Sequence, residues 1–145
     1  MAIRKKIIDR FDVSGNTYAV LHAAMHLVAA GLLYLIFQPN LSINLTKLIP
    51  IALGTVVVDL DHIPLWIEKG LRGYLKLRSM EEFGKPRRYA IHNFFFLIGS
   101  LGGCLFLMLP ETIPLGLFSA AFAIHLIWDF LEDIVIFDMG YGHWI

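Results

Sequence analysis

The sequence predicts an all-α fold, an integral membrane four-helix bundle forming one membrane-embedded domain over residues 1–145. Hydrophobic residues make up 57% of the chain, against roughly 45–50% in soluble domains, and the mean hydropathy is +0.66. The charged residues, 17% of the chain, gather between four apolar segments or near their ends. The predicted spans cover about 17–37, 48–67, 90–109 and 115–137.

The first predicted span, residues 17–37, contains no Asp, Glu, Lys or Arg. Its length matches the roughly 20 apolar residues that cross a bilayer. Ser14 and Asn16 are the candidate caps at its start, because their side chains can accept hydrogen bonds from the first turn. This segment is therefore expected to be one continuous transmembrane helix.

The second predicted span, residues 48–67, carries the acidic cluster Asp59-Leu60-Asp61-His62 near its end. Pro50 lies close to the start, where proline is tolerated, and Pro64 is expected to end or kink the helix just after the cluster. Ionisable side chains inside an apolar span cost free energy and are usually functional. This cluster is the first sign of a site.

The third and fourth predicted spans, residues 90–109 and 115–137, are separated by a predicted tight turn at 110–114. The third contains Cys104, the single cysteine of the chain, so no intramolecular disulfide can form. Its apolar and glycine neighbours favour a packed small residue over a reactive thiol.

Two basic segments are predicted to lie at the membrane surface. Residues 3–11 read as a basic amphipathic helix on anionic lipid, with a frayed tail that only sets topology as the alternative. Residues 68–89 read as an interfacial segment that either binds anionic headgroups or merely anchors the topology.

The distribution of basic residues predicts the orientation in the membrane. Four Lys or Arg precede the first span and seven lie in residues 68–89, against Lys47 alone in the first short connection and none in the 110–114 turn. Under the positive-inside rule, both termini and the long loop lie on the cytoplasmic side of the cell (inner, cytoplasmic) membrane.

The ionisable residues of the spans are predicted to meet at one depth, in the cytoplasmic half of the bundle and facing the cytoplasmic leaflet. With alternating helix directions and about 1.5 Å of rise per residue, five of the six histidines fall at one level. The predicted metal ligands are His22, His26, Asp59, Asp61, His62, His92, His125 and Asp129.

Each of these motifs has a purely structural alternative. His22 and His26, one turn apart, could form interhelical hydrogen bonds; the acidic cluster could cap a helix end; and His125 with Asp129 could be a local pair. Independent structural uses have no reason to share one depth on four helices, so we favour a metal site. The donors are nitrogen and oxygen without thiolate, so zinc is expected first, with manganese, magnesium or iron as alternatives, as one or two ions.

Catalysis and substrate binding are assigned to a second set of residues. We assign Asp61, His92 and Glu132 to catalysis, with Glu132 left open as a general base, a metal ligand or a support of a ligand. Arg87 and Arg88 are assigned to a substrate phosphate, which a guanidinium can bind through two hydrogen bonds. The alternative for the two arginines is that they only set the membrane topology.

The pattern resembles the small inner-membrane proteins described as membrane-bound metal-dependent hydrolases of the YdjM type. The resemblance covers essentially the whole chain, and the motifs come in the same order. The family has a histidine in the first helix, a Pro-Asp-x-Asp-His block ending the second, a His-Arg-Gly-x-Thr-His-Ser block opening the third, and His-x-x-x-Asp in the last. The counterparts here are His22 or His26, Asp59–His62, Arg87–Asn93 and His125–Asp129.

Three positions depart from that family pattern. Val58 replaces a proline, Arg87 stands in place of a histidine, and Asn93 stands in place of a serine. A missing histidine implies either one metal fewer or a substitute in His26. The family is likened to zinc-dependent phospholipase C, which is a comparison of folds only.

Three functional hypotheses follow. The leading one is a membrane-embedded metal-dependent hydrolase that cleaves a phosphate ester of a lipid or other amphiphile with metal-activated water. The second is a metal-ion binding or transport protein, and the third is a non-catalytic membrane module in which His and Asp pair only with each other. Membrane lipid is the expected environment and substrate, no nucleic acid is expected as a partner, and a homo-oligomer is left open.

Overall fold

The structure, a computed structural model, describes residues 15–40, 42–64, 67, 90–136 and 144. Within these ranges every regular element is helical, so the predicted all-α class is confirmed for them. The α-helices are α2 (Gly15–Phe37), α3 (Leu45–Val57), α5 (Phe94–Gly103) and α6 (Ile113–Leu131). The short elements are the 3-10 turns η1 (Val58–His62), η2 (Cys104–Met108) and η3 (Pro110–Thr112) and the π-helical turn η4 (Glu132–Ile136).

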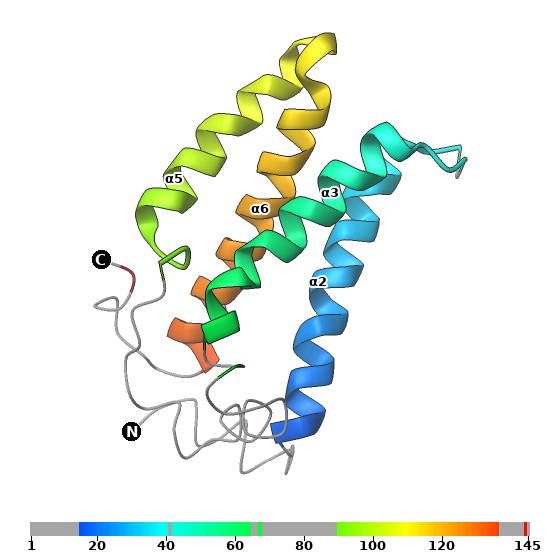
Figure 1. The fold of residues 1–145 in the computed structure, drawn as a ribbon. Coiled ribbons are helices and arrows are strands. Elements are labelled where there is room, and N and C mark those ends of the chain that lie inside the picture. Colours follow the sequence, from blue (N-terminus) through cyan, green and yellow to red (C-terminus); the bar gives the residue numbers. More distant parts are fainter. Residues whose placement is uncertain (1–14, 41, 65–66, 68–89, 137–143, 145) are drawn as a thin grey trace.

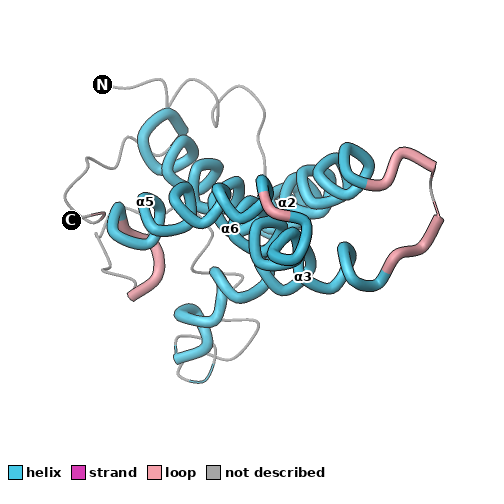
Figure 2. The backbone as a smooth tube through the Cα atoms, turned by 90° about the horizontal axis from the view of Figure 1, so that it is seen from above, coloured by secondary structure: helices cyan, strands magenta, loops and turns pink. Residues whose placement is uncertain are grey.

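The four α-helices alternate in direction, and α6 lies at the centre of the arrangement (Figure 1). It contacts α2, α3 and α5, and its most extensive contact is with α3. Seen from above, α6 runs between α5 on one side and α2 with α3 on the other (Figure 2). As a result, one end of the bundle gathers the start of α2, the end of α3, the start of α5 and the end of α6.

Helix α3 approaches α6 closely because Gly54 has no side chain. A Cβ atom placed on Gly54 would overlap the carbonyl oxygen of Phe118 and come within 3.0 Å of the Ala121 Cβ. Small residues at such positions let helix backbones come together. The contact fixes the position of α3 along α6. It therefore also fixes the position of Thr55, the next residue, which is buried.

The helix boundaries differ from the predicted spans in informative ways. The second predicted span is no uniform helix, because α3 gives way at Val58 to the tighter η1, six residues before Pro64. In the third span, α5 begins only at Phe94, where the Asn93 side chain accepts a hydrogen bond from the Phe96 N–H and caps the helix. At the 110–114 turn, η3 leads directly into α6 at Ile113.

Two of the described helical stretches, Val20–Phe37 and Pro110–Ile134, are long and apolar enough to span a membrane. A third apolar stretch, Phe94–Met108, is shorter. Large apolar side chains cover much of the described surface: Leu27 is 70% exposed and Phe95 82% exposed. The predicted interfacial segments, 3–11 and 68–89, lie outside the described residues.

Candidate metal centre

Seven histidine and aspartate side chains gather at one end of the bundle. Helix α2 supplies two histidines one turn apart, α6 supplies a histidine and an aspartate one turn apart, and η1 and the residue before the α5 cap supply the rest. In the order of the chain they are His22, His26, Asp59, His62, His92, His125 and Asp129.

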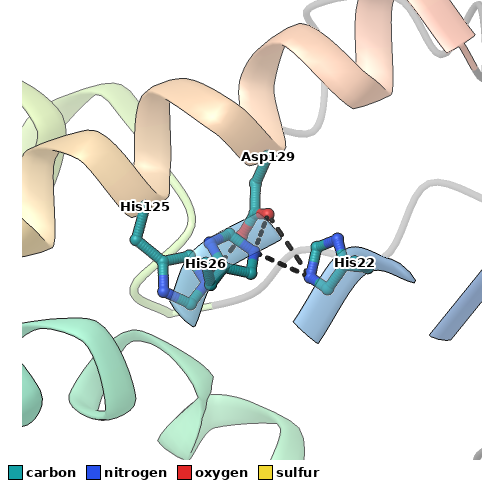
Figure 3. Close-up of side chains that lie close together, drawn as sticks. All are labelled: His22, His26, His125 and Asp129. Carbon is teal, nitrogen blue, oxygen red and sulfur yellow. Dashed lines mark hydrogen bonds and ion pairs between the residues drawn. The ribbon is translucent and has the colours of Figure 1, made fainter. Parts of the chain in front are cut away.

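Four of these side chains form what we call the four-ligand group: His22, His26, His125 and Asp129. All four are buried, and one candidate ligand atom from each lies within 4.8 Å of the others. In Figure 3 the two histidines of α2 point toward the two side chains of α6, with the Asp129 carboxylate between them. A residue spacing of four places both members of each pair on one face of its helix.

The Asp129 carboxylate contacts imidazoles on both of its oxygens. Its Oδ1 lies 3.3 Å from His26 Nε2 and 3.7 Å from His22 Nε2. Its Oδ2 lies 2.8 Å from His92 Nε2 and 3.2 Å from His125 Nε2. In a tetrahedral zinc site with metal–ligand bonds of about 2.0–2.2 Å, neighbouring ligand atoms are about 3.3–3.6 Å apart. The distances from Asp129 to His22, His26 and His125 are close to this range, whereas the 2.8 Å contact with His92 is a hydrogen bond.

The orientation of His125 leaves a donor atom pointing into the group. Its Nδ1 donates to the Thr55 carbonyl oxygen at 2.6 Å, so a neutral ring carries its lone pair on Nε2. That Nε2 faces the carboxylates of Asp129 and, at 3.7 Å, Asp59. His125 Nε2 and Asp129 Oδ1 are buried without a hydrogen-bond partner. A lone pair facing carboxylates is stabilised by a cation, so these residues fit a metal ion.

Glu132 orients the ring of His22, as the Thr55 carbonyl orients the ring of His125. His22 Nδ1 donates to Glu132 Oε2 at 2.9 Å, and Glu132 Oε1 accepts from Trp128 Nε1 at 2.5 Å. The opposite nitrogen, His22 Nε2, lies 2.9 Å from His26 Nε2 inside the four-ligand group. A carboxylate behind a histidine is the usual support of a metal-binding imidazole. The structure therefore places Glu132 behind His22, on the side away from the group.

Asp59, His62 and His92 form a three-ligand group beside the first. One candidate ligand atom from each again lies within 4.8 Å of the others. The two histidines are buried with ring centroids 4.8 Å apart, whereas the Asp59 side chain is 38% exposed. Because His92 Nε2 contacts Asp129 Oδ2 at 2.8 Å, the two groups are in direct contact.

Three acidic side chains lie among the histidines at this end of the bundle. Asp59, Asp129 and Glu132 bring negative charge, and the remaining donors are imidazoles. Over the described ranges, Lys47 is the sole Lys or Arg, and it donates to Phe37 O and Gln38 Oε1, near the other end of α2. Burying the Asp129 carboxylate among imidazoles without a positive charge is costly, so a divalent cation would be a suitable counter-charge for Asp129.

Trp144 closes the site from one side and was not part of the sequence-based prediction. It is fully buried against Phe94 and Phe130, its ring centroid lies 6.3 Å from that of His92, and its Nε1 donates to Asp133 Oδ2 at 2.9 Å. The indole thus covers the start of α5 beside His92.

Thr55 and Trp128 are two further positions that the sequence-based reasoning missed. Their spacing held a signal: Thr55 precedes Asp59 by four residues and Trp128 precedes Glu132 by four, so each shares a helix face with an acidic residue. Three other predicted site residues are not placed. The Asp61 side chain, Arg87 and Arg88 lie outside the described part of the structure.

Comparison with protein-family models, with curated proteins and with solved structures gives no match to this chain. The fold and the site therefore define the class by themselves: an all-helical protein with a buried His/Asp cluster that could hold a metal ion. The resemblance to membrane-bound metal-dependent hydrolases stays a prediction from the sequence.

Proposed function

We propose that this protein is a membrane-embedded metal-dependent hydrolase that cleaves a phosphate ester of a lipid or other amphiphilic molecule. The observation that carries the proposal is the position of Asp129, a buried carboxylate contacted by imidazoles on both oxygens. Its Oδ1 atom, and the His125 Nε2 atom that lies 3.2 Å from its Oδ2, have no hydrogen-bond partner. Structural pairing alone would be expected to satisfy these atoms, because unpaired buried polar atoms are costly.

The membrane environment is supported by the surface of the helices. The exposed faces of α2 and α5 carry large apolar side chains, among them Val20, Leu27, Ile36 and Phe95. Monomeric soluble proteins rarely expose contiguous apolar surface of this kind. Together with two helices of sufficient length and the distribution of basic residues in the sequence, this favours a multi-pass protein with its site toward the cytoplasmic leaflet.

The chain's own residues have distinct tasks in this proposal. His22, His26, His125 and Asp129 hold a divalent cation, zinc first because the donors mix imidazole with carboxylate. A divalent cation of this centre that keeps a coordination position open would polarise a phosphoryl oxygen as a Lewis acid and make a bound water more acidic.

Five further residues complete the proposal. Glu132 holds His22 with its Nε2 toward the cation, and Arg87 and Arg88 contact the substrate phosphate from the cytoplasmic interface. Asp61 and His92 stay assigned to proton transfer and water positioning. His92 has a partner suited to that task, since its Nε2 donates to the Asp129 carboxylate.

A lipid hydrolysis assay on the intact protein tests this function. The purified chain is loaded with zinc in nanodiscs and given vesicles of phosphatidylcholine, phosphatidylglycerol or phosphatidate, and water-soluble phosphate products are measured by mass spectrometry. We expect product release that is lost on chelation and in the Asp129→Asn variant, with the exposed Glu111→Gln variant as the matched control. Absence of any phosphate product from zinc-loaded protein would contradict the proposal.

The alternative functions give different results in the same preparation. Zinc flux into liposomes without lipid hydrolysis would identify a transporter. A cluster without catalytic function would leave thermal stability and metal content unchanged after chelator treatment.

A further inference from the structure

We propose that the centre binds two divalent cations of unequal role: a closed, slowly exchanging one in the four-ligand group and an open, exchangeable one in the three-ligand group. The role of the second ion rests on the proposed hydrolase function, whereas the number of ions and their exchange do not.

The four-ligand group can saturate a tetrahedral ion by itself. His22, His26, His125 and Asp129 supply four donors, and all four side chains are at most 10% exposed. Zinc sites with four protein ligands are structural, since no position remains for water or substrate. An ion held here is shielded from solvent and from chelators, so it should exchange slowly.

Counted over the described residues, the three-ligand group leaves one position of a tetrahedral ion unfilled. Asp59, His62 and His92 supply three donors, which is the number found in catalytic zinc sites, where water or substrate takes the fourth position. Asp59 is also the most exposed of the seven side chains, at 38%, so solvent reaches this group from its side. An ion held here is accessible to both substrate and chelator.

The two groups share a boundary that suits neighbouring cations. Asp129 turns Oδ1 toward His22 and His26 and Oδ2 toward His92 and His125. His125 Nε2 lies 3.2 Å from Asp129 Oδ2 and 3.7 Å from Asp59 Oδ1, so it adjoins carboxylates of both groups. Two positive charges lie close together only where carboxylates separate them, and Asp129 lies at that boundary.

Counting bound ions in the intact protein tests the inference. The chain is purified in detergent, loaded with zinc, freed of excess metal and assayed by elemental mass spectrometry before and after dialysis against a weak chelator. We expect about two ions per chain, falling to about one after the chelator. Asp59→Asn should hold about one ion from the start, and that ion should resist the chelator.

Two further variants keep the result interpretable. His62→Gln removes a different donor of the three-ligand group and should repeat the Asp59→Asn result, with circular dichroism confirming that the helices are retained. Glu111→Gln changes an exposed acid in η3 and should behave as wild type. One ion in the wild type, two retained in both variants, or none retained in variants of native helicity would overturn the inference.

The outcomes also separate this inference from the proposed function. Two ions without hydrolysis of any phosphate ester would refute the hydrolase and leave the two-ion centre standing. Hydrolysis by a chain that holds a single ion would refute the two-ion centre and leave the hydrolase standing.

Discussion

Replacing Gly54 by alanine should both destabilise the bundle and loosen the metal centre. The added Cβ would overlap the Phe118 carbonyl oxygen, a backbone atom of α6 that cannot rotate away. The two helices must then separate by several tenths of an ångström along their most extensive contact. Overpacking of this kind typically costs about 1–3 kcal/mol.

The matched control is Gly31→Ala in α2, where an added Cβ meets nothing within 4 Å. Both substitutions replace a helical glycine, so both gain the same roughly 0.5–1 kcal/mol of helix propensity. The stability difference between the two variants therefore isolates the steric cost at Gly54.

The effect on metal binding follows from the next residue. Thr55 O accepts the hydrogen bond from His125 Nδ1 at 2.6 Å, so displacing α3 removes the group that orients this ring. Loss of such a supporting hydrogen bond lowers metal affinity roughly 10–100-fold. Thermal unfolding in detergent and competition with a zinc indicator measure the two effects. If Gly54→Ala matched Gly31→Ala in both assays, the close-packing argument would be wrong.

Three further variants probe the supports of the site. Glu132→Gln removes the charge behind His22 and should weaken zinc binding roughly 10-fold or more without loss of helicity; an unchanged affinity in the indicator assay would contradict that role. Asn93→Ala removes the side-chain cap of α5 and should lower the free energy of unfolding by about 1 kcal/mol, measured by chemical denaturation, whereas Asn93→Ser should keep most of it. Trp144→Ala empties a fully buried position and should lower the free energy of unfolding by about 3–5 kcal/mol. An unfolding curve of this variant that matched the wild type would contradict the prediction.

The helices were largely predictable because the apolar pattern is long and uninterrupted. Residues 17–37 predict a helix, and the structure has one at Gly15–Phe37. Residues 48–67 were harder, since proline suggested a break only at Pro64, whereas the change to 3-10 geometry begins at Val58. Side-chain patterns carry little information on such backbone tightening, which depends on what the turn packs against.

The gathering of His22, His26, His125 and Asp129 was predictable from depth alone, because helix rise fixes the level of each residue once the spans alternate. How the ligands divide into the four-ligand and three-ligand groups could not be predicted from depth. Which carboxylate oxygen faces which imidazole depends on helix rotation about its own axis, and depth says nothing about rotation. For the same reason the sequence left open whether Glu132 is a metal ligand, a support of a ligand or a general base, and the structure adds that its carboxylate accepts from His22 Nδ1.

Long-range contacts of single residues were the least predictable part. Trp144 reaches Phe94 and Phe130 from a position that no helical periodicity connects to them. Thr55 contributes a main-chain carbonyl to His125, and a carbonyl group is common to every residue. Neither contact leaves a pattern in the sequence.

The central position of α6 has a consequence for biogenesis. Among the described helices it comes last in the chain, yet it supplies both His125 and Asp129. While the chain up to α5 is being made, His22, His26, Asp59, His62 and His92 have no α6 partners, so the cluster cannot be completed before α6 is synthesised. In the proposed metal centre, capture of the ion would therefore be a late event, and a bound ion would report that α6 has docked.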